Sequence, residues 1–174
     1  MQKVRIPVSV EPIKSAQKRL SYAGLVPADN LQRLRDELIN TPQDIEVSLR
    51  FDVDEQRISY FAGHAEVTVD VLCQRCNNPM QLHLVSDFQY APLTKRMQEE
   101  DVPQAYEPIK MNELGEVMLH DVVEDELLLA LPIVTMHKPE ECNVDRDTMT
   151  YGELPPEAEQ KANPFAVLQD LKRK

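Results

Sequence analysis

The sequence of 174 residues is poor in several residue types, and each shortage excludes a class of protein. It contains no Trp, only 4 Gly, and aromatic residues make up only 5% of it. It has no run of about 18 apolar residues, so we expect no membrane-spanning helix and no membrane partner. Its first residues lack the apolar stretch of a signal peptide. We therefore expect a cytoplasmic protein.

Sequence motifs of catalysis are missing as well. The chain has no Gly-rich phosphate loop, no HExxH pattern and no G-x-S-x-G pattern. Its histidines at 64, 83 and 120 fall on separate predicted elements and have no chemical partner at a meaningful spacing. The sequence therefore predicts a protein that is not an enzyme.

The charge is unevenly distributed. The net charge is −11, and residues 97–160 carry 17 acidic but only 3 basic groups, whereas residues 1–96 are neutral. Such an acidic region is repelled by phosphate backbones and attracts basic proteins. We therefore expect a basic protein partner, although excess acid could also serve only to keep the chain in solution. The acidic residues predicted to contact that partner are Glu99, Glu100, Asp101, Glu140 and Glu141.

Alternating apolar residues predict an antiparallel β-meander. Its strands cover residues 45–53, 58–73 and 80–90, with a hairpin loop after the first. In the second strand Ile58, Tyr60 and Ala62 are expected to face the core. Beyond Gly63 the apolar positions shift by one residue. This shift predicts a β-bulge at the glycine. Further strands are expected at residues 3–10, 20–25 and 106–111.

Two helices, at residues 27–39 and 119–131, are predicted to cover the sheet because their apolar residues follow helical spacing. On the second helix, Glu124 and Asp125 are interpreted as a solvated face. Glu126 lies nearer the apolar side and is expected to make a structural hydrogen bond or ion pair. The predicted fold class is therefore α+β, an antiparallel sheet meander covered by two helices.

The C-terminal part is predicted to be a separate region. We assign residues 1–137 to the α+β domain and 138–174 to a flexible acidic linker with a short terminal amphipathic helix. Phe165, Leu168 and Leu171 share one side of that helix, which is too short to persist alone. The helix is thus expected either to bind a partner or to pack on its own domain, and the sequence leaves both open.

All three cysteines fall in two clusters of potential metal ligands. Cys73 and Cys76 lie at a predicted hairpin tip, and His137 and Cys142 follow much later in the chain. Three thiolates and an imidazole suit a structural zinc site with tetrahedral geometry. Two alternatives stay open: Cys73 could be only a small buried apolar residue, or the Cys-x-x-Cys pair could be a redox motif.

Several segments together resemble the bacterial YceD family, the large ribosomal RNA subunit accumulation proteins. They are Cys73-Gln-Arg-Cys76, the stretch from Val123 to Pro132 and the tail from Asn163 to Leu168, supported by residues 16–20 and 152–155. The resemblance implies a cytosolic, non-enzymatic factor for synthesis, processing or stability of 23S ribosomal RNA. Many relatives carry further cysteines after the Leu-Pro segment. Here His137 stands near one of those positions, and the later cysteines of the relatives are absent.

The resemblance and the charge map together predict a mechanism. The acidic surface would bind a basic large-subunit ribosomal protein or an assembly intermediate, and would act on the rRNA indirectly. One alternative is direct rRNA binding through Arg50, Arg57, Arg75 and the basic tail. The other is an interaction module that responds to zinc or to redox state.

Overall fold

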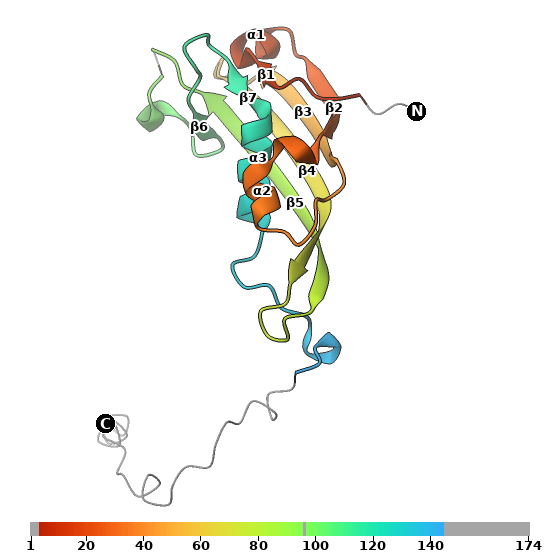
Figure 1. Cartoon of the computed structure of the whole chain (residues 1–174). Helices are drawn as coiled ribbons and strands as arrows, with labels where there is room; N and C mark the ends of the chain where they lie inside the picture. The colour runs from red at the N-terminus through yellow and green to blue at the C-terminus, as the bar shows by residue number, and fades with distance from the viewer. Residues whose placement is uncertain (1–3, 96, 145–174) are drawn as a thin grey trace, which may run out of the picture.

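A five-stranded sheet forms the centre of the computed structural model, which describes residues 4–95 and 97–144 (Figure 1). The strand order is β2-β3-β4-β5-β6, and β2 to β5 pair antiparallel. The edge strand β6 runs parallel to β5. The bounds are β2 Ser21–Val26, β3 Ile45–Val53, β4 Ser59–Leu72, β5 Pro79–Pro92 and β6 Glu107–Ile109. The predicted α+β class and antiparallel meander are confirmed, with one parallel strand added at the edge.

Helices and a small second sheet complete the described part of the chain. The other elements are β1 Ser9–Val10, β7 Val117–Met118, α1 Pro12–Gln17, α2 Gln32–Asp36, α3 Leu119–Ala130 and the short 3-10 turns η1 Ala28–Asn30, η2 Glu99–Asp101 and η3 Pro139–Glu141. The strands β1 and β7 pair with each other. Across the residues that the structure describes, no helix is both long enough and apolar enough to span a bilayer.

The core lies between one face of the sheet and the helices. Figure 1 shows α2 and α3 packed in front of the sheet. In β3 every second residue from Ile45 to Phe51 is buried, and α3 contributes Leu119, Val123 and Leu127. The intervening residues of β3 are polar and mostly exposed. This alternation is the half-buried pattern expected of an antiparallel sheet that is covered on one side.

The N-terminal elements differ from the prediction. The helix expected at residues 27–39 is divided into η1 and α2, because Leu31 between them has the non-helical angles φ −106° and ψ 73°. The strand expected at 3–10 is reduced to Ser9–Val10, preceded by a bridge between Arg5 and Leu25. Helix α1 was not predicted, since it is only six residues long.

The prediction of a β-bulge at Gly63 is wrong. The register of β3 with β4 and of β4 with β5 continues unbroken through Gly63, which lies opposite Leu49 and Phe88. The inward series is Phe61, Gly63 and Ala65. A Cβ atom at position 63 would lie 2.2 Å from the Phe88 ring, so glycine provides the room that this ring needs. The residue is thus explained by packing, and the second strand keeps one phase throughout.

The β4–β5 hairpin extends well beyond the rest of the sheet. Strand β3 pairs with β4 only as far as Glu66, whereas β4 and β5 stay paired to Leu72 and Pro79. The hairpin therefore forms a narrow arm, and the chain that leaves α3 runs along it to the tip (Figure 1). We call residues 131–144, which follow α3, the strap. Arm and strap bring together residues that are far apart in the sequence.

Candidate metal centre

The tip of the β4–β5 hairpin is a tight turn that carries Cys73 and Cys76. The N–H of Cys73 donates to the Asn78 carbonyl at 2.9 Å, and the N–H of Asn77 donates to the Cys73 carbonyl at 2.8 Å. Asn77 has φ 56°, a left-handed conformation that Asn tolerates better than most residues. The turn therefore fixes the backbone from which both thiols project.

Hydrogen bonds hold the strap against this tip. The N–H of Gln74 donates to the Thr135 carbonyl at 2.8 Å, and the Thr135 hydroxyl donates to the Leu72 carbonyl at 2.6 Å. The Gln74 side chain also donates to the Ile133 carbonyl at 3.3 Å. These contacts place His137, two residues after Thr135, beside the cysteines.

The four predicted ligands meet in one cluster. One ligand atom from each of Cys73, Cys76, His137 and Cys142 lies within 4.8 Å of all the others. The Cys76 sulfur and the His137 Nδ1 are 3.4 Å apart. Around a tetrahedral zinc ion with Zn–S bonds of about 2.3 Å, sulfur atoms lie about 3.8 Å apart. The cluster thus has the size and the donor types that such an ion requires. Within residues 4–95 and 97–144, no other group of three or more His, Cys, Asp or Glu ligands is this close.

The cluster is electrostatically suited to a cation. Burial raises the pKa of Cys73, but N–H groups of Cys76, His137 and Arg75 that point to its sulfur outweigh this and lower the pKa to about 5. The Asn78 N–H lowers the pKa of Cys76, whereas burial and the thiols of Cys73 and Cys142 raise it, and the net shift is upward. The two pKa shifts are therefore opposite, and Cys73 is the more acidic of the two thiols. A metal ion would remove this difference, because coordinated thiols lose their protons.

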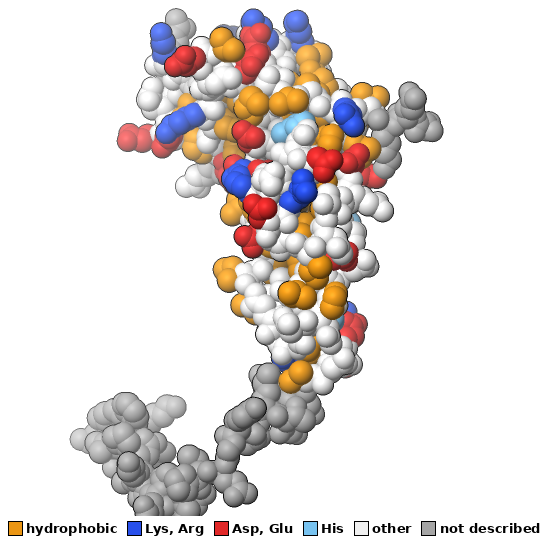
Figure 2. Space-filling view, in the orientation of Figure 1, with side chains coloured by type: hydrophobic (Ala, Val, Ile, Leu, Met, Phe, Trp, Pro, Cys, Tyr) orange, Lys and Arg blue, Asp and Glu red, His pale blue; other side chains and the backbone are white. Residues whose placement is uncertain are grey.

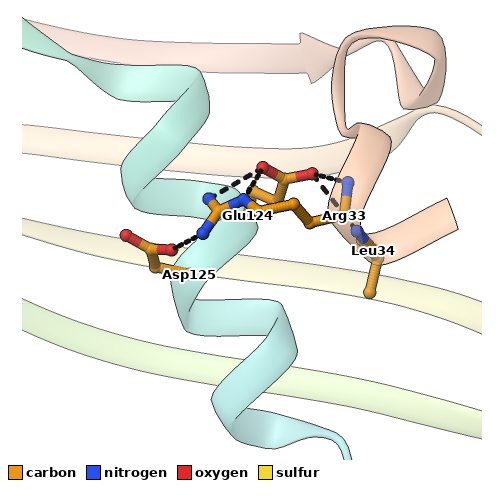
Figure 3. A network of polar contacts seen from close by, with 4 residues as sticks. All are labelled: Arg33, Leu34, Glu124 and Asp125. Atoms are coloured by element: carbon orange, nitrogen blue, oxygen red, sulfur yellow. Dashed lines mark hydrogen bonds and ion pairs between the residues drawn. The ribbon is translucent and has the colours of Figure 1, made fainter. Parts of the chain in front are cut away.

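The interpretation of Glu124 as part of a solvated face is wrong. Glu124 is only 5% exposed, and its carboxylate accepts hydrogen bonds from the N–H groups of Arg33 and Leu34 at 2.7 and 3.2 Å. The Arg33 guanidinium also bridges Glu124 and Asp125, at 2.8 and 2.7 Å (Figure 3). Glu124 thus joins α3 to the first residues of α2. Sequence periodicity could not identify the burial of Glu124, because the packing of α2 decides which face of α3 is covered.

Glu126 is buried too, as its position nearer the apolar side indicated. Its carboxylate accepts hydrogen bonds from the hydroxyls of Ser86 and Tyr90 on β5. Burial and the nearby Glu126 carboxylate raise the pKa of Tyr90 well above its usual value. The residue therefore has the structural role of attaching α3 to the sheet.

The predicted acidic contacts do not form one surface. The turn η2 (Glu99–Asp101) is tied to the β6 end by an ion pair of 3.3 Å between Glu99 and Lys110. Glu140 and Glu141 lie on η3, in the strap beside the hairpin tip. Strand β5, whose 14 residues span roughly 40 Å, separates η2 from η3. Phe165, Leu168 and Leu171 lie outside the described residues, and their role stays a prediction.

The fold and the cluster define a small α+β protein whose hairpin tip and strap together carry a three-cysteine, one-histidine cluster that could hold a metal ion. Residues 61–172 match the family described as large ribosomal RNA subunit accumulation protein YceD. The chain is also 47% identical, over the full length of both sequences, to a Haemophilus influenzae protein named large ribosomal RNA subunit accumulation protein YceD. The chain therefore belongs to the YceD family. No solved structure matches it.

Proposed function

We propose that this chain is a non-enzymatic ribosome-biogenesis factor of the cytoplasm that supports the synthesis, processing or stability of 23S rRNA. The observation that carries the proposal is the full-length match, at 47% identity, to a relative whose name states large ribosomal RNA subunit accumulation. Identity at this level over the whole chain leaves no part of the relative unmatched. The absence of catalytic motifs from the sequence agrees with a factor that acts by binding.

The proposal includes one structural zinc ion held by Cys73, Cys76, His137 and Cys142. The spacing of their ligand atoms, all within 4.8 Å, supports it. Four protein ligands leave no open coordination position for catalysis. The ion would fasten the strap to the hairpin tip and so fix the surface that both segments form.

We place the main contact with a basic large-subunit protein at this narrow end. Glu140 and Glu141 are exposed on the strap, where Ile133 is 95% exposed and Val134 and Met136 are also exposed. Figure 2 shows hydrophobic side chains gathered on the narrow half, on the face that α2 and α3 also occupy. A surface that combines apolar and acidic side chains suits a basic protein with its own apolar residues. The turn at Glu99–Asp101 remains a second proposed contact.

A groove at this end supports the same placement. It has a volume of about 690 Å³ and lies between the end of α2, the arm and the strap. Leu38, Leu72, Leu128 and Ile133 are among its apolar lining residues, and Asp36 and Glu37 add negative charge beside them. We propose that an apolar side chain of the basic partner enters it, flanked by Lys or Arg.

Direct rRNA binding by the described residues is less well supported. Of the three arginines considered for it, Arg50 is paired with Asp52 at 2.7 Å. Arg75 donates to the Cys142 sulfur at 2.9 Å. Both guanidinium groups have a partner within the protein, but the Arg50 side chain is 73% exposed, and Arg57 is exposed in the turn between β3 and β4. Direct rRNA binding is therefore disfavoured by the net charge of −11, because contacts of basic residues with phosphate supply most of the affinity for nucleic acid.

The proposed role predicts an rRNA phenotype. In cells that lack this chain, we expect less 23S rRNA relative to 16S rRNA, and we expect the plasmid-borne wild-type gene to restore the ratio. The two rRNAs are quantified from the same sample, so that changes in growth rate affect both. An unchanged ratio of 23S to 16S rRNA in the deletion strain would reject the proposed role.

The proposed partner surface predicts a charge dependence. Reversal of Glu140 and Glu141 to Lys should weaken binding to a purified basic large-subunit protein on the order of tenfold at low salt, because complementary charge speeds association. The effect should diminish as the salt concentration rises. Calorimetric titration of such proteins, one at a time, measures it.

Reversal of Glu99 and Glu100 to Lys provides the matched comparison at the other end of the molecule. Both double variants should melt close to the wild-type temperature, because all four side chains are exposed and an exposed ion pair such as Glu99–Lys110 contributes little stability. If 23S rRNA fragments bind tightly at physiological salt while the basic proteins do not bind, the direct rRNA alternative replaces the proposed partner.

A further inference from the structure

Arg75 makes two side-chain contacts from the hairpin tip to the strap. It lies inside the Cys73–Cys76 turn and is half-buried. Its Nε donates to the Cys142 sulfur at 2.9 Å, and its Nη2 donates to the His137 carbonyl at 3.1 Å. One guanidinium therefore contacts both strap residues that carry ligand atoms.

The charge of Arg75 is directed at the cluster. Among the residues that the structure describes, no carboxylate forms an ion pair with it, although Glu140 and Glu141 lie close to Cys142 in sequence. A zinc ion with three thiolates and one neutral imidazole carries a net charge of −1. The guanidinium, which is always protonated, offsets that charge, and its N–H donor also stabilises a thiolate.

We propose that Arg75 is a positioning residue of the metal centre, which orients Cys142 and His137 and neutralises the zinc–thiolate charge. The inference rests on the proposed zinc ion. Outer contacts to metal ligands orient them and set the affinity of the site, and their loss commonly weakens metal binding by roughly 10–100-fold. The same role explains why the residue before Cys76 is an arginine, whose planar fork can reach a sulfur and a carbonyl together.

Three variants test the assignment by competition for zinc against a chromophoric chelator at pH 7. Arg75→Gln should lower the zinc affinity roughly 10–100-fold. The zinc affinity of Arg75→Lys should lie between those of Arg75→Gln and the wild type, since lysine keeps the positive charge but lacks the planar guanidinium. Lys138→Gln removes the same charge from an exposed position of the strap and should bind zinc as the wild type does.

A spectroscopic readout separates this role from a purely structural one. With cobalt(II) in place of zinc, the thiolate-to-cobalt absorption bands of Arg75→Gln should shift relative to the wild type, because Cys142 loses its hydrogen bond. A lower metal-free melting temperature with unchanged zinc affinity and cobalt spectrum would overturn the inference.

The outcomes also distinguish this inference from the proposed zinc site. If the wild-type chain binds no zinc, both are rejected. If the wild-type chain binds zinc and Arg75→Gln binds it equally well, the zinc site stands and the role of Arg75 is rejected.

Discussion

The purified wild-type chain is expected to carry about one equivalent of zinc, and Cys76→Ser is expected to carry none after dialysis. Cys76 contributes one of four ligands, and its sulfur lies 3.4 Å from His137 Nδ1. Serine is a much poorer ligand for zinc than thiolate, so the remaining three groups should not retain the ion. Metal analysis of gel-filtered protein measures the difference.

Loss of the ion should also lower stability. A ligand present at about 1,000 times its dissociation constant stabilises the folded state by about 4 kcal/mol, which corresponds to a shift of about 8–16 °C in the melting temperature of a domain of this size. A chelator should thus lower the melting temperature of the wild type. It should leave that of Cys76→Ser unchanged.

Two substitutions at His137 sharpen this test. His137→Ala should lose the metal, whereas His137→Cys should retain it, because zinc accepts four cysteines as readily as three cysteines and a histidine. A metal-free wild type whose melting curve does not respond to zinc or to a chelator would contradict the proposed site. Retention of metal by His137→Ala would remove this residue from the ligand set.

The second large effect is expected at Glu124. Glu124→Ala should lower the free energy of unfolding by about 3 kcal/mol, because it leaves the N–H groups of Arg33 and Leu34 without their acceptor. Leu34 itself is completely buried, so water cannot readily replace the carboxylate. Urea unfolding, followed by circular dichroism, measures the loss.

Two further variants separate charge from shape in this network. Glu124→Gln keeps an acceptor oxygen and should lose about half as much stability. Asp125→Asn is the matched control, since Asp125 is exposed and also contacts Arg33; its effect should be close to the error of measurement. Equal losses for Glu124→Ala and Asp125→Asn would show that the carboxylate of Glu124 does not join the two helices as described.

The sheet and the buried carboxylate show where sequence reasoning succeeds and where it fails. The alternation of apolar and polar residues from Ile45 to Phe51 identified β3, because in a strand with one covered face every second side chain is buried. The same reasoning placed a bulge at Gly63, since it could not foresee that the Phe88 ring fills the space above this glycine. Glu124 was assigned to solvent because the N–H groups that donate to its carboxylate come from a segment about 90 residues away.

The sequence by itself determined the elements whose signal is local: the long strands, helix α3, and four soft ligands in two clusters. It also determined the acidic character of residues 97–160. Only the tertiary structure decided which of these features meet. It joined the two ligand pairs at the hairpin tip, covered Glu124 with α2, and separated the two acidic turns by the length of β5. The physical reason is that side-chain periodicity records which face of an element is buried, whereas the partner of that face depends on how distant segments pack.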